Sequence, residues 1–277
     1  MDYQKIDLSL NGPLVIQRLV DFIASQIKSA GFSKAVLGLS GGIDSTLVAY
    51  LTAKAIGRDN LLAIRMPYRT SSQESMFHAQ IVGEKLGIQT KTMAISEMAD
   101  ALIYLQPEMS PVRKGNIMAR CRMITLFDQS ADWGGLVVGT GNKTEALLGY
   151  TTLFGDSACA FNPVGDLFKT QVRQLSRELG VPEDIINKPP SADLWSGQTD
   201  EGELGFSYDD VDQLLYHIVN LGESFDEVVS AGFDPAFVAS VAKRIRSNHF
   251  KRVPAPIAIL SHDAVIKDLA DLKDWGI

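Results

Sequence analysis

Apolar and polar positions along the first half of the chain alternate between helical and strand-like patterns. In residues 13–30 apolar side chains recur at three- and four-residue spacings, which predicts a helix. Short continuous apolar runs instead predict buried strands at 34–40, 61–67, 90–95 and 136–142. Helical patterns separate or follow these runs at 45–57, 71–87, 96–105 and 117–131. The polar stretch 106–116 is predicted to be a loop.

Strands that alternate with helices indicate βαβ units, so we predict an α/β fold: a doubly wound parallel sheet flanked by helices. Ligands of such sheets bind at the carboxyl ends of the strands. Loops 38–45 and 139–145 follow two of the predicted strands and therefore lie at such ends. The polar, glycine-rich stretch 188–207 is predicted to be a mobile loop. We expect residues 1–277 to form a single domain.

Composition narrows the kind of partner. The chain has 277 residues, of which 45% are hydrophobic, and 33 acidic residues against 26 Lys and Arg give a net charge of −7. Such a chain, without a basic block of about five or six residues, is a poor candidate for coating nucleic acid. We therefore expect small-molecule substrates and no nucleic-acid partner. The short basic pairs Arg113–Lys114 and Lys251–Arg252 remain candidates for holding an anionic ligand.

The cysteines and the N-terminal residues indicate the cellular compartment in which the protein is expected. Cys121 and Cys159 are far apart and form no C-x-x-C motif, so we expect two small buried residues in a reducing compartment, and no zinc site. The N-terminus lacks the charged-then-apolar pattern of a signal peptide. No apolar run approaches the ~20 residues of a membrane helix. We expect a cytoplasmic protein without a membrane partner.

The stretch GLSGGIDS at 38–45 carries the first candidate chemistry. Its paired glycines let a phosphate approach the main chain, and its serines supply hydroxyl donors. The helix that follows offers N–H groups and about half a positive charge. The stretch is neither GxxxxGK[ST] nor GxGxxG, and Asp44 suits a Mg²⁺ ion placed between this carboxylate and phosphates. The alternative is a tight strand-to-helix turn in which Asp44 is an ordinary first-turn acid.

SGGIDS after an apolar strand resembles the pyrophosphate-binding loop of the ATP pyrophosphatase group, the SGGxDS enzymes that split ATP into AMP and pyrophosphate. Later segments resemble ammonia-dependent NAD synthetase in order and spacing: LVVGTGNKTEALLGY (136–150), LFGDSACAFNPVGDLFKTQVRQL (153–175) and NKPPSADLW (187–195). RKGNIMARCRM (113–123) matches the family's upstream segment. The resemblance covers residues 14–256 and implies an adenine nucleotide alpha hydrolase-like fold.

The resemblance implies roles for individual residues. ATP contacts are implied for Gly38, Leu39, Ser40, Gly41, Gly42, Ile43, Asp44, Ser45, Arg65, Thr140, Lys169 and Ser191. The magnesium positions fall on Asp44 and Glu145, which are 101 residues apart. Two carboxylates that share one ion with phosphate oxygens form a sensible hard-cation site. Lys169 and Asp44 are the implied catalytic residues, with Lys169 stabilising charge on the phosphates.

The resemblance also implies contacts to deamido-NAD. These fall on Arg120, Asp156, Asn162 and His249, with Arg122 as the alternative to Arg120. Asp193 lies in the same predicted loop as the ATP-contacting serine. The family often carries a lysine and an aspartate where this chain has Leu153 and Ala160, and a lysine where it has Phe250. We therefore expect the pyridine half of the substrate to be recognised differently.

The implied activity is ATP-dependent amidation of deamido-NAD to NAD. The substrate carboxylate attacks the α-phosphorus of ATP, which gives an acyl adenylate and pyrophosphate, and ammonia then displaces AMP. The implied cofactor is Mg²⁺, and the implied partners are deamido-NAD, ATP, ammonia and a second copy of the chain in a homodimer. A length of 277 residues leaves no room for the family's glutaminase domain, so we expect free ammonia or a separate glutaminase as the donor.

Two other classes of function stay open. The first is another SGGxDS enzyme, either GMP-synthetase-like or tRNA-modifying. Thiolation of tRNA requires a catalytic cysteine pair, and tRNA binding requires a basic surface. Neither feature is evident in this sequence. The second is a nucleotide-binding protein that keeps the fold without catalysis.

Overall fold

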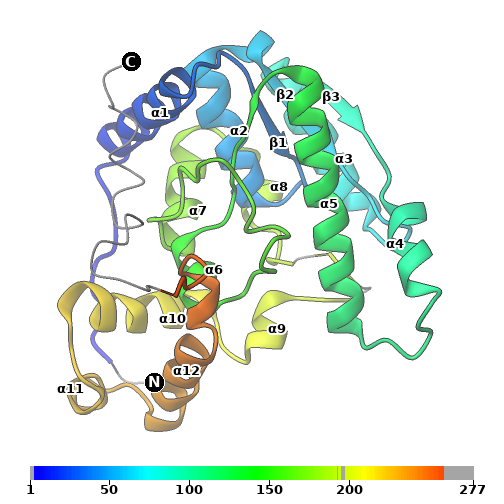
Figure 1. Cartoon of the computed structure of the whole chain (residues 1–277). Coiled ribbons are helices and arrows are strands. Elements are labelled where there is room, and N and C mark those ends of the chain that lie inside the picture. The colour runs from blue at the N-terminus through cyan, green and yellow to red at the C-terminus, as the bar shows by residue number, and fades with distance from the viewer. Residues whose placement is uncertain (1–2, 192, 195–196, 259–277) are drawn as a thin grey trace.

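The computed structural model describes residues 3–191, 193–194 and 197–258 (Figure 1). The elements of the α/β part are α1 Gly12–Ser29, β1 Ala35–Gly38, α2 Ile43–Ile56, a 3-10 turn Arg58–Asn60, β2 Leu61–Arg65, α3 Gln73–Leu86, β3 Gln89–Thr92, α4 Ser96–Ile103, α5 Pro111–Trp133, β4 Leu136–Val137, α6 Lys143–Leu148, α7 Lys169–Glu178 and α8 Glu183–Ile186. The remaining elements are α9 Asp200–Leu204, α10 Tyr208–Leu215, a π-helical turn Tyr216–Leu221, α11 Phe225–Ser230, α12 Pro235–Ser247 and a 3-10 turn His249–Lys251.

The sheet has four parallel strands in the order β3-β2-β1-β4. Ala35 of β1 pairs with Leu61 of β2 on one side and with Leu136 of β4 on the other. The chain thus builds outward from β1 to β3 and then returns to the opposite side of β1. This reversal makes the β1–β4 border the switch point of a doubly wound sheet, where ligands bind. The predicted fold class is confirmed.

Alternate residues of the strands face two different layers of helices. Ala35 and Leu37 belong to the large apolar cluster that includes residues of α1, α2 and α3. Val36 and Ile64 belong to a smaller cluster with Leu126 of α5. Figure 1 shows α5 on one side of the sheet, with α1 and α2 on the other. Because both faces are covered, the central strands read as continuous apolar runs rather than as alternating ones.

The C-terminal helices build a second core. Its fully buried residues include Tyr208, Leu214, Val228, Phe233 and Val241. Figure 1 shows α10, α11 and α12 grouped away from the sheet. The end of α6 and the start of α7 contribute to this second core, while the rest of α7 packs into the first one. Helices α6 and α7 therefore lie where the two cores meet.

The segment that precedes α1 is held by glutamine side chains. Gln213 of α10 accepts from the backbone N–H of Ile6 and donates to its carbonyl, both at 2.9 Å. Gln174 of α7 makes the same pair of bonds with Leu10, also at 2.9 Å. The amides replace the partner strand that an extended backbone would otherwise need. The N-terminal segment thereby joins the two helices that support it.

The expected loop 106–116 is wrong in its second half, because α5 begins at Pro111. The side chain of Ser110 accepts a hydrogen bond from the backbone of Arg113 at 3.5 Å, and proline suits the first turn of a helix. Proline and glycine near this point favoured a loop in the sequence. The cap shows that the same proline starts the helix.

The expectation of two buried cysteines is met only in part. Both thiols are free, and Cys121 is buried as expected, whereas Cys159 is only half-buried. Within the described ranges, no helix is long and apolar enough to span a bilayer.

Candidate functional site

The turn between β1 and α2 is closely packed against α3. Gly41 has a φ of +80°, and a Cβ atom at this position would lie 2.1 Å from the backbone carbonyl oxygen of Ser75. Only glycine combines this left-handed backbone with such a close approach. The turn is therefore packed tightly against α3.

Serine hydroxyls brace the same turn from inside. Ser45 Oγ accepts from the backbone N–H of Ser40 at 3.2 Å and donates to the carbonyl of Gly42 at 3.1 Å. Gly42 occupies the N-cap position of α2, where it has no side chain to satisfy the first N–H groups. Such uncapped N–H groups at a helix N-terminus bind anions well. The loop thus has the features of a phosphate cradle.

Three charged side chains meet beside this turn. Lys169 Nζ lies 2.6 Å from Asp44 Oδ2 and 3.0 Å from Glu145 Oε1. The two carboxylates follow β1 and β4, which are neighbours in the sheet, and the lysine begins α7. The lysine side chain is 2% exposed and each carboxylate 18% exposed, so the carboxylates form the mouth of the site and the ammonium its floor.

Asn142 closes the network from the N-cap of α6. Its side-chain Nδ2 donates to Asp44 Oδ1 at 2.8 Å, and its backbone N–H donates to Glu145 Oε2 at 3.2 Å. Its Oδ1 accepts from the backbone of Glu145 at 2.9 Å, which completes a capping box. All four carboxylate oxygens therefore have a donor. Asn142 lies within the GTGN segment, but no pattern in the sequence singles it out.

Burial and charge act in opposite directions on these groups. Burial raises the pKa of Glu145 to about 7, although the Lys169 ammonium lowers it. Burial lowers the pKa of Lys169, but the carboxylates of Asp44 and Glu145 outweigh this effect and raise the pKa above its ordinary value. The lysine is therefore a fixed cation between two acids. When both carboxylates are ionised, one positive charge against two negative ones leaves the cluster attractive to a further cation.

The cluster suits a divalent ion that arrives with its own oxygen ligands. Asp44 and Glu145 supply hard carboxylate oxygens on either side of the Lys169 ammonium, so this position already holds one cation. Among the residues that the structure describes, no three His, Cys, Asp or Glu side chains gather into a complete metal site. Phosphate oxygens would have to complete the coordination of such an ion.

Two tyrosines and a buried acid support the lysine and were missed in the sequence. The ring of Tyr208 lies 5.1 Å from Lys169 Nζ, and its hydroxyl donates to Asp200 Oδ2 at 3.0 Å. Tyr150 donates to the other oxygen of Asp200 at 3.1 Å. Burial raises the pKa of Asp200, while Lys169 lowers it. No local motif marks these residues, because their relation to the lysine arises only from packing.

The other residues with implied ATP contacts lie at neighbouring strand ends. Arg65 is the last residue of β2, and its Nε is buried without a hydrogen-bond partner among the described residues. Thr140 follows β4 and is half-buried. Because β2, β1 and β4 are adjacent and parallel, these positions share one edge of the sheet with the SGGIDS turn.

Ser191 and Asp193 lie in a segment that crosses to α3. Ser191 is exposed, and its Oγ accepts from the backbone N–H of Asp193 at 3.1 Å. The Asp193 carboxylate in turn accepts from the backbone of Ser72, the N-cap of α3, at 3.0 and 3.2 Å. The expected loop 188–207 is therefore tied down at this point, and it also contains the helix α9.

The arginines proposed for deamido-NAD differ in exposure. Arg120 is exposed on α5, and its Nη2 donates to the carbonyl of Leu153 at 3.2 Å. Arg122 lies deeper, donates to the carbonyl of Met66 at 3.2 Å, and has its pKa lowered by burial. Arg120 is thus the more accessible of the two. Leu153 contributes its backbone, not its side chain, to this contact.

Asp156 and Asn162 bond to the main chain of the loops that they occupy or adjoin. Asp156 accepts from the Thr151 hydroxyl at 2.5 Å and from the backbone of Thr152 at 2.7 Å. Asn162 is exposed and donates to the carbonyl of Gly141 at 2.7 Å. Both side chains shape the loops around the end of β4.

The basic pair at 251–252 holds a helix end. Lys251 donates to the carbonyls of Gly149 and Thr151 at 2.7 and 2.8 Å. Arg252 donates to the carbonyl of Leu147 at 2.7 Å. Cations stabilise the C-terminal carbonyls of a helix, here those of α6, so both of these candidate anion-binding side chains already bond to the main chain. His249 is exposed beside Arg252.

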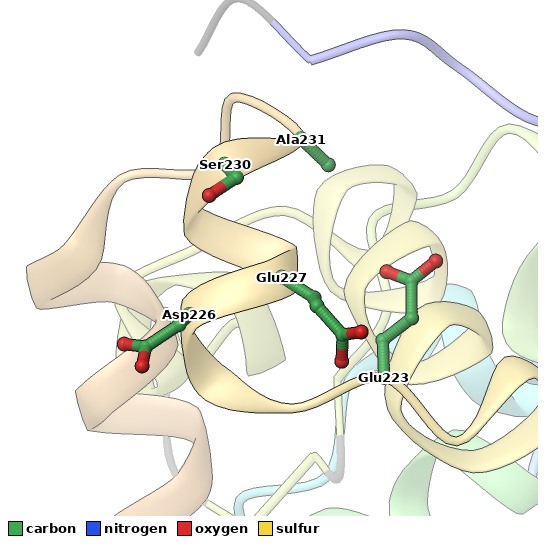
Figure 2. Close-up of a pocket in the computed structure, with 5 residues that line it drawn as sticks. All are labelled: Glu223, Asp226, Glu227, Ser230 and Ala231. Atoms are coloured by element: carbon green, nitrogen blue, oxygen red, sulfur yellow. The ribbon is translucent and has the colours of Figure 1, made fainter.

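A hollow of about 300 Å³ lies on α11, away from this site. Figure 2 shows its lining residues, Glu223, Asp226, Glu227, Ser230 and Ala231. Three of the five are acidic, so the hollow repels phosphate groups. A nucleotide is better placed at the strand ends.

Comparison with known proteins agrees with this geometry. Residues 15–255 match the profile of the NAD synthase family. The NH(3)-dependent NAD(+) synthetase of Trichlorobacter lovleyi is 52% identical over 269 residues, which cover 97% of this chain and 98% of that protein. The structure of NMN synthetase from Francisella tularensis aligns with a TM-score of 0.81 at 32% identity, over 90% of this chain and 99% of the other. The NH3-dependent NAD synthetase of Campylobacter jejuni aligns with a TM-score of 0.77 at 34% identity, over 90% of this chain and 100% of the other. The chain belongs to the NAD synthase family, among the ammonia-dependent NAD synthetases.

Proposed function

We propose that the chain converts deamido-NAD to NAD with ATP and ammonia, and releases AMP and pyrophosphate. One observation carries the proposal: the Asp44–Lys169–Glu145 cluster lies directly beside a glycine-rich turn at the sheet's switch point. That combination offers main-chain donors for a pyrophosphate and fixed charges for the phosphates that react. The matched relatives support it through their names and their near-complete coverage.

ATP is proposed to lie along the carboxyl ends of β2, β1 and β4. Residues 38–45 would bind its β- and γ-phosphates through main-chain N–H groups and serine hydroxyls. Arg65, Thr140 and Ser191 are the proposed contacts to the rest of the nucleotide. The buried, unpartnered Nε of Arg65 supports its place among them, because a buried donor without an acceptor is costly unless a ligand satisfies it.

Asp44 and Glu145 are the residues proposed to hold Mg²⁺. A bound Mg²⁺ would neutralise phosphate charge while the leaving pyrophosphate forms. The residual negative charge of the cluster and the oxygen-only donor set support this assignment.

The remaining chemistry belongs to positioning and charge stabilisation by this chain. Lys169 lies at the floor of the cluster, so its ammonium is placed to stabilise negative charge on the phosphates of ATP. When the substrate carboxylate attacks the α-phosphorus, the turn at 38–45 retains the pyrophosphate and keeps the leaving oxygen in line. Ammonia then attacks the acyl carbon and AMP leaves. No protein nucleophile is needed in either step.

Arg120, Asp156, Asn162 and His249 are the proposed contacts to deamido-NAD. Arg120 lies on α5 and bonds to the carbonyl of Leu153, Asn162 bonds to the carbonyl of Gly141 after β4, and His249 lies beside Arg252, which holds the end of α6. Leu153, Ala160 and Phe250 offer no charge to the pyridine half. Arg120, whose guanidinium already lies against the Leu153 carbonyl, is the cation that we propose in their place.

A mononucleotide is a second candidate substrate. The aligned Francisella tularensis structure is an NMN synthetase, and apolar side chains stand at 153 and 160. A site with fewer contacts to a second nucleotide would accept the smaller acid. Nicotinic acid mononucleotide is therefore a second substrate to assay.

We further propose that the chain acts in the cytoplasm as a homodimer and as a single catalytic domain supplied with ammonia. The near-complete coverage of ammonia-dependent relatives supports the single domain and the ammonia.

AMP release measured with ATP, Mg²⁺ and ammonium tests the proposal. Turnover should require deamido-NAD or its mononucleotide, and a comparison of the two kcat/KM values selects between these substrates. Turnover that instead requires tRNA or xanthosine monophosphate would contradict the proposal and favour another SGGxDS enzyme. Tight ATP binding without turnover would favour a binding protein.

A further inference from the structure

The start of α7 lacks a cap of its own. The helix begins at Lys169, and Phe168 occupies the N-cap position, where its side chain offers no acceptor. The first N–H groups of a helix need partners when they are buried. Two side chains from elsewhere provide them: Thr144 Oγ1 accepts from the backbone of Lys169 at 3.0 Å, and Asp212 Oδ2 accepts from the backbone of Thr170 at 2.8 Å.

These two side chains also bond to each other. Thr144 Oγ1 donates to Asp212 Oδ1 at 2.5 Å, and both residues are fully buried. Thr144 lies in the first turn of α6, directly before Glu145. One carboxylate from α10 thereby connects the first turn of α6, which carries Glu145, to the first turn of α7, which carries Lys169.

The connection needs a carboxylate. Each Asp212 oxygen accepts a hydrogen bond, from Thr144 on one side and from the backbone on the other. An ionised acid also interacts favourably with the positive end of the α7 dipole. An amide has only one acceptor atom and would have to turn a donor toward one of these partners.

We propose that Asp212 and Thr144 are positioning residues for the reaction: they set the distance between Glu145 and Lys169 and so align the charges that act on the phosphates. This inference rests on the proposed function. The physical reason is that groups which stabilise charge must be held close to their productive geometry by a supporting shell. A merely structural cap would stabilise the fold but would leave the rate per folded molecule unchanged.

The experiment compares four variants with the wild type. Thr144→Val removes both hydrogen bonds of the hydroxyl, Thr144→Ser keeps them, and Asp212→Asn removes one acceptor. Thr125→Val is the matched control, because Thr125 is also buried and bonds only to the carbonyl of Cys121, one turn earlier in α5. The folded fraction and the thermal midpoint are measured by circular dichroism, kcat and KM for ATP by AMP release, and ATP affinity by calorimetry.

Thr144→Val and Asp212→Asn should lower kcat per folded molecule by about 10- to 100-fold. Thr144→Ser should restore it to about wild-type level, and Thr125→Val should leave it unchanged. Calorimetry should show weaker ATP binding in the same two variants even without turnover. Wild-type kcat in folded Thr144→Val or Asp212→Asn would overturn the inference, as would an equal loss in Thr125→Val. If both variants fail to fold while Thr144→Ser is fully active, the pair acts on stability alone and the inference is overturned.

Different experimental results would contradict the proposed function and the proposed positioning role. Absence of turnover by the wild type with deamido-NAD and with nicotinic acid mononucleotide would contradict the proposed function. In that case, calorimetry would still compare the ATP affinity of the variants with that of the wild type. A wild-type chain that turns over at a rate indifferent to Thr144→Val contradicts only the positioning role.

Discussion

Lys169 Nζ lies 2.6 Å from Asp44 Oδ2, although the two residues are 125 positions apart in the chain. The lysine is almost completely buried, and its ammonium also contacts Glu145. A buried charge is tolerated only when its partners compensate for lost hydration, so each of the three residues depends on the other two. Removing Lys169 would leave two carboxylates without a cation between them, whereas removing either carboxylate would leave the ammonium with a single partner.

Asp44→Asn should abolish most of the activity while the fold stays intact. The amide keeps the shape and one acceptor, but it carries no charge for Lys169 or for a divalent ion. We expect kcat to fall by about 100- to 1,000-fold, the loss typical when one electrostatic contributor to a reaction is removed. AMP release measures the rate and circular dichroism the fold. Asp59→Asn, which changes an exposed acid, is the control and should be fully active. An active Asp44→Asn enzyme would remove the proposed metal role.

Glu145→Gln should change how stability depends on pH. In the wild type, burial raises the pKa of Glu145 from 4.5 to about 7, so the folded state holds a proton that the unfolded state has already released. The Glu145 contribution to stability is therefore fully present below pH 4.5 and is lost as pH rises to about 7. Glutamine does not titrate. The free energy of unfolding of the wild type should thus fall relative to the variant by roughly 3 kcal/mol across this window. Urea titrations at several pH values measure it, and parallel pH profiles would contradict the shift.

Gly41→Ala should damage both stability and activity, whereas Gly57→Ala should affect only stability. Both glycines have a positive φ, +80° and +81°, so an alanine at either position carries backbone strain. A Cβ at Gly57 meets nothing within 4 Å, but a Cβ at Gly41 meets the Ser75 carbonyl. We expect an additional loss of about 1–3 kcal/mol at Gly41, together with weaker ATP binding. Equal losses in the two variants would show that the turn can shift away from α3.

Gln213→Leu should loosen the N-terminal segment. The variant removes both bonds to the backbone of Ile6, which contribute about 1 kcal/mol each. We expect a loss of roughly 2 kcal/mol in the free energy of unfolding and faster amide exchange at residues 3–10. Gln80→Leu, which removes an exposed bond to Glu84, should stay within about 0.5 kcal/mol of the wild type. Unchanged exchange at residues 3–10 would show that the segment is held by its apolar contacts.

The parallel α/β fold and the placement of the candidate loops at strand ends could be predicted because they depend on short-range patterns. Continuous apolar runs marked the buried strands, and the helical patterns between them required parallel crossovers. Loops 38–45 and 139–145 were expected at carboxyl strand ends, and β1 and β4 proved to be neighbours. The approach of Asp44 to Glu145 follows from that topology.

The supporting residues could not be predicted, because their partners are distant in sequence. Asp212 and Tyr208 belong to the C-terminal core and reach the cluster only through the packing of α10 against α6 and α7. Asn142 has a local capping role, and its bond to Asp44 depends on strand order. The predicted start of one helix was also wrong. The proline after Ser110 was expected to lie in a loop, but it begins α5.

Asp44, Glu145 and Lys169 each lie in the first turn of a helix, in α2, α6 and α7 respectively. The far ends of α2 and α7 lie away from these three charges. Changes of helix length at those two far ends can therefore accumulate without moving a reacting group, whereas a shift of one residue at any of the three starts rotates a charge out of the cluster. The tolerance of this enzyme to change in length should be sharply polarised along α2 and α7.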